Sequence, residues 1–235
     1  MKNREVAQFI SEKTETILQE HCWSLEESND WNTHSLIFYK KERHVWNCIE
    51  ILLEEDLEEC SAAFGFSATT YYPRFEEILN PILVQNNLVA SDYNNDIPCT
   101  SFDHQEHFKN TLPKSGFRIA SQIHLEQLND LLHKFINEDA LPSFENWNTI
   151  ASLYNFIQNK SAEDLHVILG PFAPMKKAVI YRLCNDPRGL IVINEFHEQQ
   201  KRLCAQDPQN KNNSRLYNAS KELKINLEKT TPILN

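Results

Sequence analysis

Residues 45–53 read VWNCIEILL, and two similar segments lie close by, SLIFYKK at 35–41 and AAFGFSATT at 62–70. β-Branched and aromatic residues of this kind suit a pleated, half-buried surface. Every second residue from Val45 to Leu53 falls on one face of the middle segment, and that set is apolar apart from one asparagine. The three segments predict neighbouring antiparallel strands, with residues 41–44 as a short hairpin connection between the first two.

The third strand contains a glycine, Gly65, which predicts a local irregularity. Strand alternation places Ala62, Phe64, Phe66 and Ala68 on one face and Gly65 on the other. Glycine inside a strand marks either a β-bulge or the close approach of another backbone. Both alternatives remain open at this point.

Helical patterns flank these strands. Residues 3–22 have an amphipathic pattern, and residues 73–83 begin with a proline that suits a first helical turn. We expect both helices to cover one face of the sheet, and we interpret the polar residues 26–34 as a loop. From His124 onward the apolar spacing is helical, with predicted helices near 124–138, 146–159, 161–169, 174–185, 190–204 and 215–227.

The expected fold class is therefore α+β. It comprises an N-terminal helix, an antiparallel sheet of three or more strands with a covering helix, and an all-helical C-terminal half. We expect an α+β domain at residues 1–120 and a helical, bundle-like region at residues 121–235 packed on it. The breaker 141–143 (LPS) is expected to end the first of the later helices.

Charge is distributed unevenly along the chain. The formal net charge is −10; residues 1–120 carry 10 Lys and Arg against 20 Asp and Glu, whereas residues 121–235 carry 13 of each kind. An acidic surface repels nucleic-acid phosphate and attracts basic molecules. The composition therefore disfavours nucleic-acid binding and indicates a basic protein partner.

Other features of the composition exclude several classes of protein. The chain has four glycines, and their spacing gives no glycine-rich phosphate loop. It has no apolar run of the roughly 20 residues that span a bilayer, so no membrane partner is expected. The six cysteines are scattered and the chain begins MKNREV, without an apolar signal segment. We therefore expect a cytoplasmic protein with free thiols and without a cofactor.

The densest cluster of ionisable residues lies between residues 50 and 59. Six of these ten residues are acidic: Glu50, Glu54, Glu55, Asp56, Glu58 and Glu59. Such a cluster is either a solvated sheet end that resists association or a docking patch for a cationic partner. A calcium site is a third alternative, but the ligand spacing and central glycine of an EF-hand loop are absent.

Motifs for catalysis or metal binding are incomplete in this sequence. His104 and His107 would share one face of a helix and could contribute to a zinc site, which needs three or four ligands. His197 begins no H-E-x-x-H motif, because Lys201 stands where the second histidine would be, and we interpret it as a surface residue. Whether a cysteine and a histidine meet in space is not visible in the sequence, so no catalytic or metal residue is assigned.

The order of the N-terminal elements resembles a known group of domains. A helix is followed by an aromatic strand ending at Lys40 and Lys41, a strand with Trp46, and a strand with FGF at 64–66. Over residues 3–80 this order is similar to small bacterial domains of unknown function that are associated with toxin–immunity systems. The resemblance implies a bacterial, non-enzymatic binder, and inhibitors of basic nuclease toxins commonly present carboxylates.

The leading hypothesis from the sequence is a cytoplasmic binding protein that docks a basic protein through its acidic N-terminal half, with an immunity-type inhibitor as the concrete form. Two alternatives remain at this point. One is a hydrolase of unfamiliar class with its site between the two halves. The other is a scaffold that presents an apolar groove between helices of the C-terminal half.

Overall fold

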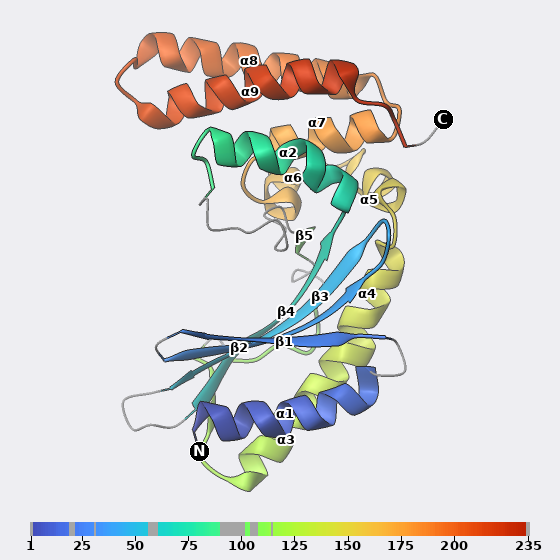
Figure 1. Ribbon diagram of the computed structural model, residues 1–235, viewed down its shortest axis with the longest axis vertical. Coiled ribbons are helices and arrows are strands. Elements are labelled where there is room, and N and C mark those ends of the chain that lie inside the picture. Colours follow the sequence, from blue (N-terminus) through green and yellow to red (C-terminus); the bar gives the residue numbers. More distant parts are fainter. Residues whose placement is uncertain are drawn as a thin grey trace. The chain divides into compact units, whose positions relative to one another are not determined.

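The computed structural model describes residues 2–18, 22–30, 32–55, 61–89, 102–103, 108–113 and 115–233 (Figure 1). Within these ranges the chain forms an N-terminal helix, an antiparallel sheet and then a helical C-terminal half. The predicted α+β fold class is confirmed.

The chain divides into two compact units, and each unit is built from two segments. The first comprises Met1–Thr70 and Asp103–Asn146, and the second comprises Tyr71–Phe102 and Trp147–Asn235. The sequence indicated one boundary at residue 120. The units differ from that division because the helix after the sheet belongs to the second unit, while residues after 120 complete the core of the first.

The sequence predicted a sheet of three or more strands, and the described residues form six. Its strands are β1 (Ser24–Asp30), β2 (Thr33–Lys41), β3 (Trp46–Glu55), β4 (Ser61–Tyr71), β5 (Phe102–Asp103) and β6 (Phe117–Ile119). The order is β1-β2-β3-β4-β5, and β6 pairs with β4. The prediction of a loop at residues 26–34 is wrong, since β1 pairs antiparallel with β2 over this region. As the sheet's first strand, β1 has the polar composition typical of an edge.

The predicted alternation in β3 is confirmed. Ile49, Ile51 and Leu53 have no exposed surface, and Val45 just before the strand is also buried. The residues between them are half-buried along the whole strand. One face of β3 therefore belongs to the apolar core, and the other face is available for polar residues.

The alternation in β4 differs from the prediction at one point. Ala63, Phe66 and Ala68 are buried, whereas Phe64 is 42% exposed. Expecting Phe64 to share the face of Phe66 was therefore wrong. The buried positions shift by one residue at Phe64 and Gly65, as they do at a β-bulge. Among the described residues, a Cβ atom at Gly65 would meet nothing within 4 Å, so none of their backbones approaches closely on that side.

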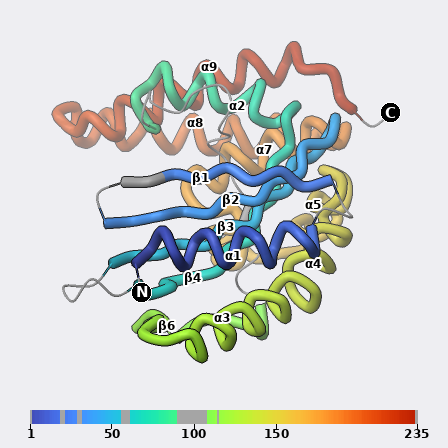
Figure 2. Tube along the Cα trace, turned by 60° about the horizontal axis from the view of Figure 1, so that its bottom comes forward, coloured from blue at the N-terminus to red at the C-terminus, as the bar shows by residue number. Residues whose placement is uncertain are grey.

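Two helical segments supply the rest of the first core. They are α1 (Asn3–Leu18) and a continuous run made of α3 (Gln122–Lys134), the π-helix η3 (Phe135–Ala140) and α4 (Leu141–Asn146). Figure 2 shows α1 lying along β2 and β3, which it contacts, together with α3. Their apolar side chains form one cluster with Leu36, Phe38, Ile49 and Ile51 of the sheet.

The helix that was expected to cover the sheet from residues 73–83 does not belong to the first core. This helix, α2 (Pro73–Gln85), packs against α7 (Ala173–Leu183) and α9 (Lys211–Lys229) of the second unit. The sequence could not distinguish the two arrangements, because α2 and α3 both carry one apolar face. The expected break at residues 141–143 is also wrong, since Pro142 lies in the first turn of α4 and η3 leads directly into that helix.

Asp139 of η3 connects residues 109–110 to the π-helix through hydrogen bonds. This carboxylate is 4% exposed. It accepts hydrogen bonds from the backbone N–H groups of Lys109 (3.1 Å) and Asn110 (2.8 Å), and from the Asn110 side-chain amide (3.1 Å). A buried carboxylate is tolerated when several donors satisfy its oxygens. Residues 109 and 110 are thus held to η3 through Asp139, and the Asn110 amide also donates a hydrogen bond to Glu138 (3.2 Å).

The second unit is helical. In addition to α2 it contains α5 (Ile150–Ile157), α6 (Ala162–Leu169), α7 (Ala173–Leu183), α8 (Arg188–Gln206) and α9 (Lys211–Lys229). Helix α8 packs against both α7 and α9 (Figure 1). The sequence predicted each of the helices after residue 146, with ends that differ from those observed by a few residues.

Candidate functional site

Three of the six acidic residues singled out in the sequence are described by the structure. Glu50, Glu54 and Glu55 lie on β3, whereas Asp56, Glu58 and Glu59 lie outside the described residues. Glu55 projects to the helical side of the sheet, where it accepts a hydrogen bond from the Asn3 backbone N–H at 3.1 Å. A carboxylate at this place favours the first turn of α1 through the helix dipole. Glu55 is thus part of the framework, and Glu50 and Glu54 remain on the opposite face.

Strand register adds a third carboxylate to the face of Glu50 and Glu54. Ile37 of β2 pairs with Glu26 on one side and with Glu50 on the other, so the three residues form one row across the sheet. Strands lie about 4.8 Å apart, which separates the Cα atoms of Glu26 and Glu50 by about 10 Å. We call the sheet face that carries Glu26, Glu50 and Glu54 the acidic face.

Sequence reasoning missed Glu26 because β1 lacks the signal that reveals a strand. Leu25 is the one apolar residue of β1, so no alternation of apolar and polar residues is visible there. The pairing with β2 places Leu25 opposite Phe38 on the core side and Glu26 on the other face.

The carboxylates of the acidic face have no neutralising ion pair within the described ranges. No ion pair joins Glu26, Glu50 or Glu54 to a Lys, Arg or His among the residues that the structure describes. The Lys41 ammonium lies at the far end of the face, 4.8 Å from the ring centroid of Tyr39 and 4.9 Å from that of Trp46. Uncompensated carboxylates on one surface create a negative potential that attracts cations.

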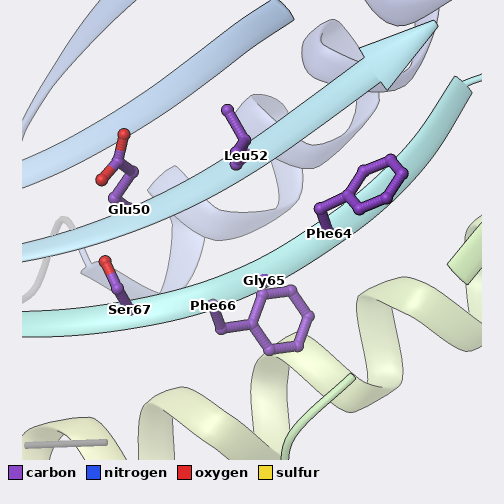
Figure 3. A pocket seen from close by; sticks show the side chains of 6 residues that line it. All are labelled: Glu50, Leu52, Phe64, Gly65, Phe66 and Ser67. Atoms are coloured by element: carbon purple, nitrogen blue, oxygen red, sulfur yellow. The ribbon is translucent and has the colours of Figure 1, made fainter. Parts of the chain in front are cut away.

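A cavity of about 180 Å³ opens beside Glu50 (Figure 3). It lies between β3 and β4 and is lined by Glu50, Leu52, Phe64, Gly65, Phe66 and Ser67. Figure 3 shows Glu50 and Ser67 at one end and Leu52 and Phe64 at the other. The Phe66 ring points to the opposite side of the sheet, where it packs against Phe135. The cavity therefore combines a polar end with an apolar end.

Because Gly116 has no side chain, it leaves space for the Phe64 ring at the edge of the cavity. A Cβ atom at Gly116 would lie 3.2 Å from an atom of this ring. The φ angle of Gly116 is +81°, in the left-handed region that favours glycine. Phe64 is thereby able to rest over the backbone beside β6 while part of its ring stays exposed.

Cys48 shares the acidic face but is not a reactive thiol. Burial raises its pKa to about 12, and the nearby carboxylates of Glu50 and Glu26 add to this effect, while a hydrogen bond with Thr69 opposes it. The thiolate is the nucleophilic form of cysteine. At neutral pH Cys48 therefore stays protonated and unreactive.

Alkylation at a fixed pH tests whether the Cys48 thiol is unreactive in the folded protein. With iodoacetamide at pH 8, we expect the exposed Cys22 to be labelled in the folded protein while Cys48 remains unlabelled, because its thiol is buried and protonated. Peptide mapping by mass spectrometry gives the extent at each site. Labelling of both residues in denaturant serves as the control. Equal labelling rates of Cys48 and Cys22 in the folded state would contradict the environment described above.

The other candidate sites receive no support. His104 and His107 lie outside the described residues, and the described residues contain no group of three His, Cys, Asp or Glu that could hold a metal ion. His197 was expected at the surface but is half-buried, stacked on Tyr217 and 3.0 Å from the Ser220 hydroxyl. Ser220 has no exposed surface, so a substrate could not reach it.

Asp186 and Arg188 form an ion pair in the second unit. The Asp186 carboxylate accepts hydrogen bonds from the Arg188 backbone N–H (2.9 Å), from Nε of its side chain (2.8 Å) and from the Tyr154 hydroxyl (3.0 Å). The bond with the Arg188 side chain is the main reason that the pKa of Asp186 is lowered. These bonds satisfy the start of α8, so the group has a structural role.

No described helix combines the length and the apolarity needed to cross a membrane. Compared with protein-family models, with curated proteins and with solved structures, the chain gives no significant match. What the protein does must therefore be inferred from its own residues.

Proposed function

We propose that the protein is a non-enzymatic binding protein that docks a basic protein partner through its acidic face. The observation that carries this proposal is the placement of Glu26, Glu50 and Glu54 on one sheet face, without ion-pair partners among the described residues. Charge concentrated in this way steers the encounter with an oppositely charged surface.

Two other acidic residues of the sheet, Glu27 and Glu55, have partners within the chain, and this contrast supports the same proposal. Glu55 contributes to the framework through its hydrogen bond to the start of α1. Glu27 also has an internal partner, since its carboxylate lies 3.2 Å from Nε2 of His34. Within the described ranges, the carboxylates of the acidic face have no such partner.

The narrower form of the proposal is an immunity-type inhibitor of a basic bacterial toxin, acting in the cytoplasm. It depends on the resemblance of residues 3–80 to immunity-associated domains and stays a prediction. The identity of the partner protein, once captured, decides between this form and a general binding role.

The proposal predicts that removal of three charges weakens partner binding. A Glu26→Gln/Glu50→Gln/Glu54→Gln variant should bind the partner about 10- to 100-fold more weakly, at about 0.5–1 kcal/mol for each lost charge. The measurement is affinity capture from cells that naturally produce the protein, followed by titration of the captured basic protein in low and in high salt.

The control carries the same change of charge elsewhere. Glu145, Glu195 and Glu228 are exposed residues on helices, so their joint replacement by glutamine should leave binding intact. Wild type and control should lose the partner in high salt, because screening weakens exposed charge pairs. Identical capture by all three proteins, or a captured protein that is acidic and insensitive to salt, would contradict the proposal.

A further inference from the structure

We propose that the cavity beside Glu50 takes one cationic side chain, a lysine or an arginine, from the protein that docks on the acidic face. This inference rests on the proposed function and adds to it the group that anchors the partner. Its residues come from two adjacent strands, β3 and β4, so the sheet itself holds the cavity in shape.

The size of the cavity selects a single side chain. Its volume is about 180 Å³. Sites for drug-sized ligands and cofactors measure roughly 300–1,000 Å³, whereas an engineered cavity of about 150 Å³ holds one benzene molecule. The cavity beside Glu50 is therefore too small for a typical cofactor and large enough for the outer part of one long side chain.

The chemistry of the lining selects an alkyl chain that ends in a positive charge. Leu52 and Phe64 offer apolar surface to methylene groups, and the Phe64 ring can also attract a cation through its π electrons. At the other end Glu50 can accept a charge-assisted hydrogen bond, and the Ser67 hydroxyl can accept a second one. Lysine and arginine present these two properties in this order.

Other classes of side chain are disfavoured by the same lining. An apolar side chain would remove water from the Glu50 carboxylate without replacing its hydrogen bonds, which is costly. An acidic side chain would be repelled by it. Lys41 supplies a precedent on the same sheet face, because its ammonium already lies against the rings of Tyr39 and Trp46.

Gly65 makes it possible to close the cavity without disturbing the strand. A Cβ atom at this position would meet no atom of the described residues within 4 Å, and the φ angle of Gly65 is not in the left-handed region. A Gly65→Leu side chain would therefore occupy the space that the partner's side chain needs. Glu50→Gln is a second variant, which keeps the shape of the side chain and removes its charge.

The test uses small probes and the full-length, ¹⁵N-labelled protein. Amide chemical shifts are followed while Nα-acetyl-lysine methylamide, Nα-acetyl-arginine methylamide or Nα-acetyl-norleucine methylamide is added up to about 50 mM, because a single residue is expected to bind only in the millimolar range. We expect a saturable shift at residues 50–52 and 64–67 with the lysine or the arginine probe. The probe with the lower Kd identifies the preferred side chain.

The variants decide whether the response belongs to the cavity. Gly65→Leu and Glu50→Gln should weaken binding of the cationic probe at least tenfold, while the control Glu145→Gln, an exposed residue of α4, should bind it within about threefold of wild type. The dispersion of amide signals reports whether each variant is folded. The inference is overturned by equal binding of the norleucine probe, by the absence of shifts at 50 mM, or by unchanged binding to a folded Gly65→Leu protein.

The two proposals fail separately. If a captured partner depends on the three carboxylates of the acidic face but binds Gly65→Leu as tightly as wild type, the cavity is not its anchor and the proposed function stands. If the cavity binds the cationic probes but capture does not depend on those carboxylates, the role in protein docking is wrong and the preference of the cavity for cations stands.

Discussion

Replacement of Phe135 by alanine should lower the free energy of unfolding of the first unit by about 3–5 kcal/mol, the usual range for a buried phenylalanine. Phe135 has no exposed surface. Its ring centroid lies 5.2 Å from that of Phe66 and 5.0 Å from that of Phe108. Alanine would leave an apolar cavity where η3, β4 and the residue 108 segment meet, and the rigid sheet could fill it only in part.

Hydrogen exchange of individual amides measures this effect within the first unit, because it reports the free energy of opening for each segment. Amides of β2 and β3 should lose protection by the amount given above. Phe64→Ala makes the same chemical change at a residue that is 42% exposed, and its effect should be only about 1–2 kcal/mol. Equal losses in the two variants would mean that the core is not centred on Phe135.

Replacement of Gly189 by alanine should destabilise the second unit by about 1–3 kcal/mol through overpacking. A Cβ atom at this position would lie 2.8 Å from the Ala178 carbonyl oxygen and 2.9 Å from the Arg182 nitrogen. Both are backbone atoms of α7, so they can move only if the helix moves. Destabilisation would be informative, because replacing a helical glycine by alanine normally stabilises the helix by about 1 kcal/mol when no such contacts are present.

Gly65→Ala is the matched comparison for this result. With no atom within 4 Å of the added Cβ, it should stabilise the first unit by about 0.5–1 kcal/mol. Hydrogen exchange in α7 and α8 for one variant, and in β3 and β4 for the other, gives both values. A Gly189→Ala protein as stable as wild type would show that α7 and α8 are not packed as closely as the structure has them.

The fold could be predicted wherever one segment carries its own pattern. The apolar alternation around Ile49 and Ile51 placed β3 correctly, and the helical spacing placed the helices of the second unit. The local sequence pattern was insufficient where pairing or packing with another segment determines the structure. Leu25 is the one apolar residue of β1, and only pairing with β2 makes that segment a strand. Helix α2 has an apolar face like that of α3, and nothing local indicates which of them covers the sheet.

Prediction of the candidate site from the sequence was limited in the same way. The acidic run singled out Glu50, Glu54 and Glu55 together. It did not show that β3 continues to Glu55, nor that Glu50 and Glu54 share a face, while the role of Glu55 depends on Asn3 at the start of α1. Glu26 joined them through a pairing 24 residues away in the sequence, because Ile37 lies between Glu26 and Glu50 in the sheet. The cavity also depends on the one-residue shift in the alternation of buried side chains at Gly65. A glycine in the sequence does not show which side chains such a shift exposes.

The wide turn of η3 also determines which side of the long helix faces the sheet. Buried side chains recur there at intervals of four, at Leu132, Ile136, Ala140 and Phe144. In a regular α-helix each such interval would rotate the next side chain by about 40° from the one before. A π-helical turn contains more residues and absorbs this drift, so one straight stripe stays on the strands. Loss of a single residue between 135 and 140 would let this segment return to regular α-helical turns. Phe144 would then stay within about 20° of the face of Leu132.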